Sequence, residues 1–197
     1  MEVILSIGVG YLLGSLIPGL WIARWRGIDI RQVGSGNIGS TNVYRTMGWW
    51  AGLIVQVIDI GKGLAALWTA QLLNVSSVGL YLTATAAVLG HIYPIWAQFQ
   101  GGKGINTLLG SMLGIEPLSA LAALGTFLMT LSFSRIVSLS SLVGVGSFLL
   151  WHGVVGSGDT VGYIAGAFWM GLVIYTHRTN IQRLIAGTEP VVGRRKS

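Results

Sequence analysis

Residues 105–133 read INTLLGSMLGIEPLSALAALGTFLMTLSF, an apolar stretch in which Glu116 is the only charged residue. Glu116 is followed by Pro117, and a proline interrupts a helix because it lacks an N–H group and clashes with the preceding turn. The stretch is therefore either one long kinked helix, or a short helix at Ile105–Ile115 followed by a second helix at Leu118–Phe133. The short helix would be about 16 Å long, which is too short for a bilayer core of about 30 Å.

Five further apolar runs lie on either side of this stretch, and together they predict an all-α integral membrane protein. About 20 apolar residues cross the hydrocarbon core as a helix. Hydrophobic residues make up 52% of the chain and charged residues only 9%, whereas soluble domains contain about 25% charged residues. The five runs are Val3–Ala23, Trp49–Leu73, Val78–Gly90, Ile136–Trp151 and Val161–Tyr175.

The basic residues choose between the two interpretations of residues 105–133, because Lys and Arg collect in cytoplasmic loops. Two helices there give about seven transmembrane helices, the fourth short, with the N-terminus outside and the C-terminus cytoplasmic. The outside turns near Asn74, Glu116 and Asp159 then contain no Lys or Arg, whereas one kinked helix would place the basic tail outside. The basic residues predicted on the cytoplasmic side are Arg24, Arg26, Arg31, Arg45, Lys103, Arg135, Arg178, Arg183, Arg194, Arg195 and Lys196.

Composition and spacing exclude several kinds of site. The chain has no cysteine, which excludes disulfides, thiolate metal sites and cysteine nucleophiles. No two histidines have zinc-ligand spacing, no His is followed five residues later by Asp, and the carboxylates are too few for a two-metal site. The net charge of +6 reflects helix orientation, so no nucleic-acid partner is expected. We expect a single domain over residues 1–197, in which the apolar N-terminus is a first helix, since it lacks the basic start of a signal peptide.

The densest polar motif covers residues 33–42, VGSGNIGSTN, with three glycines and five hydroxyl or amide side chains. Glycine lets the backbone approach a ligand closely, and successive N–H groups in such turns bind anions. Ser35, Thr41 and Asn42 add donors, and the guanidinium of Arg45 suits phosphate. A phosphate-binding loop is one interpretation of this motif, and an ordinary flexible loop is the other.

A second motif, DIGKG at residues 59–63, places two ionisable residues inside an apolar run. Charged residues in membrane helices are costly and usually face the bundle interior or a wet cavity. Asp59 and Lys62 are three positions apart, so they can pair on one helix face. The pair either serves the functional site or only neutralises itself.

A third motif joins GHIYP at residues 90–94 to FQGGKG at residues 99–104. Lys103 lies in this Gly-rich loop just before the predicted short helix, and a helix N-terminus attracts anions. The loop is not a Walker motif, because Gly104 stands where that motif requires Ser or Thr. His91 is a candidate base, although a lone histidine is more often a hydrogen-bonded structural residue.

Two weaker clusters lie near the ends of the later helices: residues 138–141 (SLSS), and His177 and Arg178 with Asn180. Hydroxyl groups in helices often bond only to helix carbonyls, and cations are favourable at a helix C-terminus in any case. The three stronger motifs each add a cation on the cytoplasmic side. Together they predict a site for a small phosphorylated anion that arrives from water. Because the apolar bundle could accept a chain from the lipid, they also predict group transfer to or from a lipid.

In order and spacing, the three motifs resemble the signature motifs of the bacterial acyl-phosphate-dependent glycerol 3-phosphate acyltransferases. The segments that match are residues 34–42, 59–63, 90–104, 11–15, 137–139 and 177–181. The resemblance covers nearly the whole chain. The chain departs from the family's pattern at three places: Ser40 stands where Ala is usual, Asn106-Thr107 where Ala near Thr is common, and Thr179 where an acid is usual.

The resemblance implies transfer of a fatty acyl group from acyl phosphate to the 1-hydroxyl of sn-glycerol 3-phosphate. The products are 1-acyl-sn-glycerol 3-phosphate (lysophosphatidate) and phosphate, and the reaction is the first acylation in bacterial phospholipid synthesis. The resemblance implies no metal and no cofactor, and it implies a multi-pass protein of the bacterial cytoplasmic (inner) membrane with its active site facing the cytoplasm. Expected partners are acyl phosphate, glycerol 3-phosphate, membrane lipid and, as a further candidate, an upstream enzyme that forms acyl phosphate.

The resemblance also assigns roles to individual residues. Ser35, Arg45 and Lys103 are expected to bind the two phosphate groups and to act in catalysis, and a substrate phosphate oxygen can take the hydroxyl proton. The alternative base is His91, with Asp59 behind it. The residues expected to orient glycerol 3-phosphate are Asn37, Thr41, Asn42, His177 and Asn180. The other predicted substrate-binding residues are Gly36, Gly39, Lys62, Gly101, Gly102, Gly104, Ser141 and Arg178.

Two other classes of function are compatible with the residues alone. A transporter of a small phosphorylated solute would suit the intramembrane Asp59 and Lys62, but the polar motifs crowd one face and the chain shows no inverted repeat. A structural membrane subunit is the third interpretation, although three glycine-plus-cation motifs exceed what helix packing needs.

Overall fold

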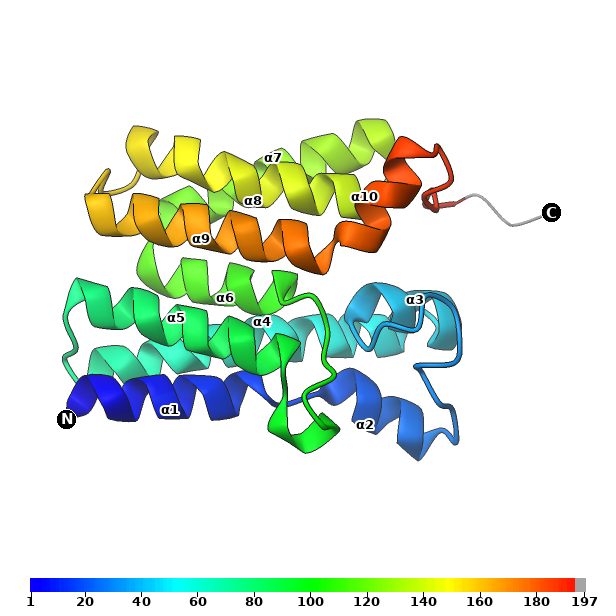
Figure 1. Cartoon of the computed structure of the whole chain (residues 1–197), viewed down its shortest axis with the longest axis horizontal. Coiled ribbons are helices and arrows are strands. Elements are labelled where there is room, and N and C mark those ends of the chain that lie inside the picture. The colour runs from blue at the N-terminus through cyan, green and yellow to red at the C-terminus, as the bar shows by residue number, and fades with distance from the viewer. Residues whose placement is uncertain (194–197) are drawn as a thin grey trace. The chain divides into compact units, whose positions relative to one another are not determined.

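The computed structural model describes residues 1–193, and within that range it contains helices and no strands. The chain divides into two compact units, Met1–Ile115 and Glu116–Ser197, and each is described by itself. The helices of the first unit are α1 (Glu2–Gly14), α2 (Pro18–Trp25), α3 (Ser40–Met47), α4 (Trp49–Leu72), α5 (Ser77–Ile92), the 3₁₀ turn η1 (Ile95–Ala97) and α6 (Ile105–Ile115) (Figure 1). Those of the second unit are α7 (Pro117–Ser134), α8 (Val137–Val154), α9 (Thr160–Thr176) and α10 (Arg178–Ile185).

The first predicted helix is broken in two near Leu16. Ile17 lies at φ −126° and ψ 68°, because the ring of the following proline forces the residue before it out of the helical conformation. α1 therefore ends at Gly14 and α2 begins at Pro18, where a missing N–H is tolerated. The break leaves the carbonyl oxygen of Leu16 outside the helix, and Lys62 Nζ donates a hydrogen bond to it at 2.6 Å. A proline in one helix thus provides an acceptor for a cation on another.

Glycines let the helices of the first unit pack at backbone distance. α1 packs against α5, and α4 packs against α6. A Cβ on Gly90 would lie 2.2 Å from the carbonyl oxygen of Tyr11, and a Cβ on Gly63 would lie 2.2 Å from that of Thr107. Because small residues allow helices to associate closely in lipid, these two motif glycines have a packing role: Gly90 brings α5, which carries His91, against α1, and Gly63 brings α4, which carries Lys62, against α6.

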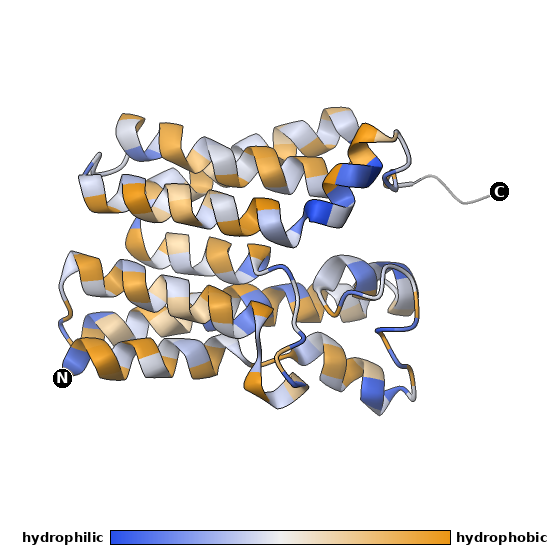
Figure 2. Cartoon of the chain, viewed as in Figure 1, coloured by the Kyte–Doolittle hydropathy of each residue, from blue (hydrophilic) through white to orange (hydrophobic). Residues whose placement is uncertain are grey.

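The outer surface of the helices is apolar, as a lipid environment requires. Within the first unit, Figure 2 shows hydrophilic residues gathered on the loops between α2 and α3 and between η1 and α6, and hydrophobic residues along the helices. Leu72, Leu121 and Ile164 are 65%, 54% and 66% exposed, and apolar exposure on this scale marks contact with lipid or another apolar surface. These helices are therefore those of an integral membrane protein.

Five helical segments of the described chain are long and apolar enough to cross a membrane: Glu2–Trp25, Trp49–Leu72, Ser77–Ala97, Pro117–Ser134 and Val137–Val154. The helices α6 and α9, with 11 and 17 residues, are apolar but shorter. All seven predicted segments are thus helical, whereas the count of seven spans and their orientation stay predictions.

The helix break predicted at Glu116-Pro117 is confirmed. Glu116 lies at φ −135° and ψ 80°, outside the helical region, and Pro117 is the first residue of α7. Residues 105–133 therefore form two helices and not one. The boundary between the two compact units falls at the same place, and whether both units act as one domain stays a prediction.

Two short helices were not predicted from the sequence. α3 overlaps the polar motif at residues 33–42 and the residues that follow it, for which no helix was predicted, and α10 lies within the basic tail. Gly39, in an extended conformation at φ −76° and ψ 165°, precedes α3 and lets the loop turn into a helix. Arg194, Arg195 and Lys196, which were predicted to be cytoplasmic, lie outside the described residues.

Candidate active site

The loop of the first motif is organised by the buried side chain of Asn42, which is 2% exposed. Its Oδ1 accepts from the backbone N–H of Ser35 at 2.8 Å, and its Nδ2 donates to the carbonyls of Ile30 and Val33 at 3.3 and 3.0 Å. Gly34 has a positive φ of 62°, and a Cβ there would lie 2.2 Å from Asn42 Oδ1. Asn42 was predicted to orient substrate, but these contacts make it the residue that shapes the loop.

The loop presents side chains that have no partner within residues 1–193. Arg45, in the last turn of α3, is exposed and makes no ion pair or hydrogen bond there, and the hydroxyl of Ser35 is likewise exposed and unbonded. Asn37 uses its Oδ1 for the backbone N–H of Gly39 at 2.8 Å. Thr41 is half-buried at the start of α3. Arg45 and Ser35 thus offer a guanidinium and a hydroxyl to an anion from water, and their role in a phosphate site stays a prediction.

The loop of the third motif folds back onto the end of α5. The N–H groups of Gly101 and Gly102 donate to the carbonyls of Ile92 and His91 at 2.9 and 3.1 Å. A Cβ on Gly101 would lie 2.0 Å from the His91 carbonyl oxygen, and a Cβ on Gly102 would lie 2.2 Å from His91 Nε2. These two glycines were predicted to bind substrate, but their N–H groups are used within the protein. Anion binding by this loop therefore depends on the half-buried Lys103 and on the first N–H groups of α6.

The second motif forms a buried cluster with His91. Asp59, Lys62 and His91 are 1%, 4% and 5% exposed. Lys62 Nζ lies 2.7 Å from Asp59 Oδ1, 2.8 Å from His91 Nδ1 and 2.6 Å from the carbonyl oxygen of Leu16. Lys62 thus makes two hydrogen bonds and one ion pair, all to groups of the protein.

The contact with Lys62 indicates the tautomer of the neutral histidine ring. Because Lys62 donates to His91 Nδ1, that nitrogen carries a lone pair, and the ring proton of the neutral imidazole is on Nε2. Nε2 faces the backbone of Gly102. Neither ring nitrogen therefore offers a lone pair to a substrate, and the geometry favours a positioning role for Asp59, Lys62 and His91 over the catalytic or substrate-binding roles predicted for them.

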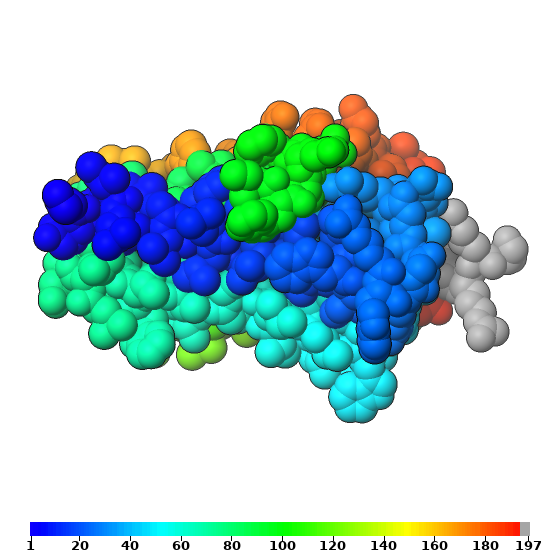
Figure 3. All heavy atoms as spheres, turned by 90° about the horizontal axis from the view of Figure 1, so that it is seen from below, coloured from blue at the N-terminus to red at the C-terminus, as the bar shows by residue number. Residues whose placement is uncertain are grey.

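Two side chains, Arg31 and Asn106, connect the segments of the first and third motifs, and neither contact was predicted from the sequence. Arg31 Nη2 donates to the carbonyls of Ala97 and Gln100 at 3.2 and 2.9 Å. Asn106 Nδ2 donates to Ser40 Oγ at 2.9 Å. Figure 3 shows the segment between α5 and α6, in green, lying against the N-terminal segments, in blue. The contacts hold the loop of Ser35 beside the loop of Lys103.

The Ser40–Asn106 contact joins two of the positions at which the chain departs from the pattern of the resembled family. The two departures therefore form one interaction.

The second unit contains four predicted substrate-binding residues, and two of them have ordinary helix contacts. Ser141 Oγ donates to the Val137 carbonyl at 2.9 Å, and Arg178 Nη1 donates to the Tyr175 carbonyl at 3.0 Å. The Arg178 guanidinium also lies 4.6 Å from the centre of the Tyr175 ring. These contacts match the alternative interpretation of both residues, in which they serve the helices themselves.

His177 and Asn180, the other two, are buried, with exposures of 2% and 7%. His177 Nδ1 lies 3.0 Å from the Val173 carbonyl, so Nδ1 carries a proton. That these four residues share one site with the loops of the first unit stays a prediction.

Glu189, which sequence reasoning missed, organises the end of the second unit. Its carboxylate accepts from Asn180 Nδ2 at 2.5 Å, from Ser138 Oγ at 2.7 Å and from Arg183 Nε at 2.7 Å. Burial raises the pKa of Glu189, but these hydrogen bonds outweigh burial and hold the pKa below its usual range. Glu189 therefore fixes Asn180, one of the residues predicted to orient glycerol 3-phosphate.

A second polar cluster of this unit joins the ends of α7, α8 and α9. His152, fully buried, has Nδ1 2.9 Å from Glu116 Oε2 and Nε2 2.9 Å from the carbonyl of Asp159. Ser119 and Ser157 also donate to Glu116, at 2.9 and 2.8 Å. Burial raises the pKa of Glu116, but the hydrogen bonds lower it by more than burial raises it, so the pKa lies below its ordinary value. These contacts indicate a structural role for the cluster, which holds the ends of the three helices together.

Comparisons with known proteins relate the chain to one family. The sequence model of a family described as glycerol-3-phosphate acyltransferase matches residues 4–187. A glycerol-3-phosphate acyltransferase of Synechococcus sp. (strain CC9902) is 43% identical over 96% of this chain and 95% of its own. One of Geotalea daltonii (strain DSM 22248 / JCM 15807 / FRC-32) is 43% identical over 98% of both chains.

Solved structures agree as well. The crystal structure of PlsY (YgiH), an integral membrane glycerol 3-phosphate acyltransferase, in its glycerol 3-phosphate form is 36% identical to this chain, with a TM-score of 0.92 over 98% of this chain and 96% of the other. The lysophosphatidic acid form of PlsY has a TM-score of 0.89 at the same identity and coverage. The chain belongs to the glycerol-3-phosphate acyltransferase family and is an integral membrane acyltransferase.

Proposed function

We propose that this protein transfers a fatty acyl group from acyl phosphate to the 1-hydroxyl of sn-glycerol 3-phosphate, giving 1-acyl-sn-glycerol 3-phosphate and phosphate. PlsY, its structural relative, has been solved in a glycerol 3-phosphate form and in a lysophosphatidic acid form, which supports this acceptor and this product. The observation that carries the proposal is that Ser35, on the loop that Asn42 shapes, and Arg45, in the last turn of α3, are both exposed and unpartnered in the described chain. A guanidinium and a hydroxyl group both suit a phosphate group.

In the proposed reaction, the 1-hydroxyl oxygen of glycerol 3-phosphate forms a bond to the carbonyl carbon of acyl phosphate. The bond between that carbon and the bridging phosphate oxygen breaks, and the electron pair leaves with phosphate. Acyl phosphate is a mixed anhydride with a good leaving group, so positioning and charge stabilisation supply much of the rate. Arg45 and Lys103 balance the charges of the two phosphate groups, and Ser35 donates a hydrogen bond to one of them.

The hydroxyl proton passes to a phosphate oxygen of a substrate in this proposal. His91 is a poor candidate base, because its Nδ1 accepts from Lys62 and its Nε2 faces Gly102. The cluster of Asp59, Lys62 and His91 acts instead by holding the end of α5, from which the loop of Lys103 begins. Asn180 and His177 orient glycerol 3-phosphate, and Glu189 holds Asn180 in place.

We further propose that the chain crosses a bacterial cytoplasmic membrane seven times and that the site faces the cytoplasm. The five long apolar helices and the two shorter ones support this number. The concentration of Lys and Arg on one set of loops supports the orientation. Glycerol 3-phosphate then reaches the site from water, and the acyl chain reaches it from the lipid.

The test uses purified protein in detergent with glycerol 3-phosphate and either palmitoyl phosphate or palmitoyl-CoA as the donor. Phosphate release and lysophosphatidate formation are followed together, with EDTA present throughout. We expect equal amounts of both products from palmitoyl phosphate and none from palmitoyl-CoA. Activity that EDTA abolishes and added metal restores would overturn the metal-free proposal.

A transporter would give a different result. If folded protein made no product from palmitoyl phosphate, the acyl-phosphate proposal would be wrong. Uptake of glycerol 3-phosphate into sealed proteoliposomes would then identify a transporter, the other function class that the motifs allow.

A further inference from the structure

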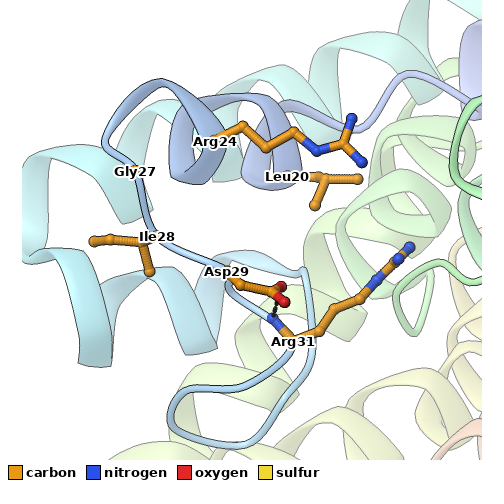
Figure 4. Close-up of a pocket in the computed structure, with 6 residues that line it drawn as sticks. All are labelled: Leu20, Arg24, Gly27, Ile28, Asp29 and Arg31. Atoms are coloured by element: carbon orange, nitrogen blue, oxygen red, sulfur yellow. Dashed lines mark hydrogen bonds between the residues drawn. The ribbon is translucent and has the colours of Figure 1, made fainter.

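A pocket of about 370 Å³ lies in the first unit between α2 and the loop that follows it. Its lining residues are Leu20, Arg24, Gly27, Ile28, Asp29 and Arg31. None of them belongs to the candidate active site predicted from the sequence. Figure 4 shows the guanidinium groups of Arg24 and Arg31 turned to the same side, with Leu20 between them. The volume falls in the range of small-ligand sites, which is about 300–1,000 Å³.

The two cations of this pocket are available to a ligand. Arg24 makes no hydrogen bond or ion pair within residues 1–193. Arg31 donates hydrogen bonds only from its Nη2, to two backbone carbonyls. Its Nη1 and Nε make no hydrogen bond within residues 1–193. Asp29 accepts from the backbone N–H of Arg31 at 3.1 Å, and its carboxylate forms no ion pair with either guanidinium. Two positive charges against one negative charge favour an anion.

The position of the pocket indicates that the anion is carried by a lipid. The pocket lies at the end of the apolar segment Glu2–Trp25, and on the same helix Trp21 and Trp25 are 44% and 86% exposed. Tryptophan is enriched where the bilayer meets water. The apolar side chains of Leu20 and Ile28 line the same pocket. A ligand with a phosphate group and an apolar part fits both kinds of lining.

The apolar part of the lining favours a lipid phosphate over a free phosphate ion. Arg24 is exposed and Arg31 is half-buried, and water weakens the attraction of such groups for any anion. A lipid headgroup is kept at high local concentration by its own acyl chains, and weak contacts then suffice for binding.

We propose that this pocket binds the phosphate headgroup of an anionic membrane phospholipid. Arg24 and Arg31 contact the phosphate, and the half-buried Ile28 contacts the first carbons of the lipid. This binding is independent of acyl transfer, since neither arginine is among the residues that we expect to contact the substrates.

The experiment measures lipid binding and not activity. Purified protein in a neutral detergent is titrated with dipalmitoyl phosphatidylglycerol or dipalmitoyl phosphatidylcholine, and bound lipid is counted by native mass spectrometry. We expect phosphatidylglycerol to bind more tightly, and Arg24→Gln to weaken it about fivefold, the effect of one basic residue at an anionic lipid surface. Arg24→Glu should weaken it further, and Arg24→Lys should bind within about twofold of the parent.

The matched control is Arg135→Gln, which removes the same charge from another exposed arginine outside the pocket. It should bind phosphatidylglycerol like the parent. Equal affinity of the parent for the two lipids, or equal loss in Arg24→Gln and Arg135→Gln, would overturn the proposal. Inorganic phosphate that displaced phosphatidylglycerol at matched concentration would assign the pocket to a free anion, and would also overturn it.

Discussion

Arg45 and Lys62 are both cations of glycine-rich motifs, but they lie in opposite environments. Arg45 is exposed at the end of α3 and has no partner in the described chain. Lys62 is 4% exposed, donates hydrogen bonds to His91 and to the Leu16 carbonyl, and forms an ion pair with Asp59. A cation with unused donors can bind a substrate phosphate, whereas a buried cation engaged by groups of the protein holds the protein around it.

The glycine-rich motifs therefore have two different roles. The loop of Arg45 and Ser35 presents groups to a ligand, and the cluster of Lys62, Asp59 and His91 supports the loop of Lys103 from behind. Substitutions in the first region should therefore reduce activity without reducing stability. Substitutions in the second region should reduce both together.

The largest effect is expected at Lys62. Lys62→Met leaves the carboxylate of Asp59 buried without its cation, and breaking a buried ion pair in this way costs about 3–5 kcal/mol. We expect a large fall in the apparent Tm of the detergent-purified protein, with activity lost as the fold is lost. Arg45→Met is the matched control, because it removes a cation of similar length from an exposed site and should leave the apparent Tm unchanged. An unchanged Tm in Lys62→Met would contradict the interpretation that the contacts of Lys62 stabilise the fold.

The next largest effect is the loss of turnover in Arg45→Met. Removing one donor that stabilises transition-state charge typically lowers kcat by about 10²–10³-fold. We expect kcat/KM for palmitoyl phosphate and glycerol 3-phosphate to fall by that factor in protein whose apparent Tm equals that of the parent. Arg45→Lys should recover part of the activity, since it restores the charge but not the forked geometry. Near-normal turnover in Arg45→Met would remove Arg45 from the phosphate site.

Glu189→Gln should have a moderate effect that depends on pH. The folded pKa of Glu189 is lowered, so its stabilising contribution is present above its unfolded value of about 4.5 and is lost as the pH falls below it. Hydrogen bonds to a charged group contribute about 1.5–3 kcal/mol. We therefore expect the apparent Tm of the parent to exceed that of Glu189→Gln at pH 7, and the difference to shrink toward pH 4. A difference that stayed constant over this range would show that the charge of Glu189 contributes nothing.

The sequence was sufficient to predict most of the fold. Apolar runs located the seven apolar helical segments, five long and two shorter, and Glu116-Pro117 together with the distribution of basic residues predicted the break between α6 and α7. The break at Pro18 was also readable, since the residue before a proline avoids the helical conformation, but a continuous apolar run concealed it. α3 was missed because its eight residues, STNVYRTM, have too little apolar periodicity to stand out within a polar stretch.

The candidate site was harder to predict, because its decisive contacts join residues far apart in the chain. The sequence identifies Lys62 and Arg45 as cations, but the acceptors Leu16 and His91 are 46 and 29 positions from Lys62. Arg31 reaches carbonyls 66 and 69 positions away. No local sequence pattern indicates which cation will be engaged by distant groups of the protein in the fold.

His91 offers a sharper test of the supporting cluster. His91→Asn replaces the ring with an amide whose oxygen can still accept from Lys62, so we expect turnover to fall by less than about tenfold, whereas loss of a general base costs about 10²–10⁴-fold. The pH dependence of kcat should also keep its shape, because the proposed proton acceptor is a substrate oxygen. A loss of more than a hundredfold in folded protein would restore His91 as the base.

The smallest effect is expected at the contact between Ser40 and Asn106, and a double-mutant cycle can isolate it. Ser40 Oγ accepts from Asn106 Nδ2 at 2.9 Å, and such a hydrogen bond contributes about 0.5–1.5 kcal/mol. Ser40→Ala and Asn106→Ala should each lower kcat/KM by a small factor. The double variant should lose no more than the worse single variant, because both singles remove the same interaction. Since the family pattern usually has Ala at the first position and Ala near the second, the double variant should fold well.

The cycle also tests whether the two loops act as one site. If the Ser40–Asn106 contact aligns the loop of Ser35 and Arg45 with the loop of Lys103, the coupling should appear in kcat/KM and not only in the apparent Tm. Coupling confined to the Tm would mean that the contact stabilises the fold without aligning the loops. Strictly additive losses in kcat/KM would mean that the two side chains do not act through each other, and the link between the two phosphate loops would then rest on Arg31 alone.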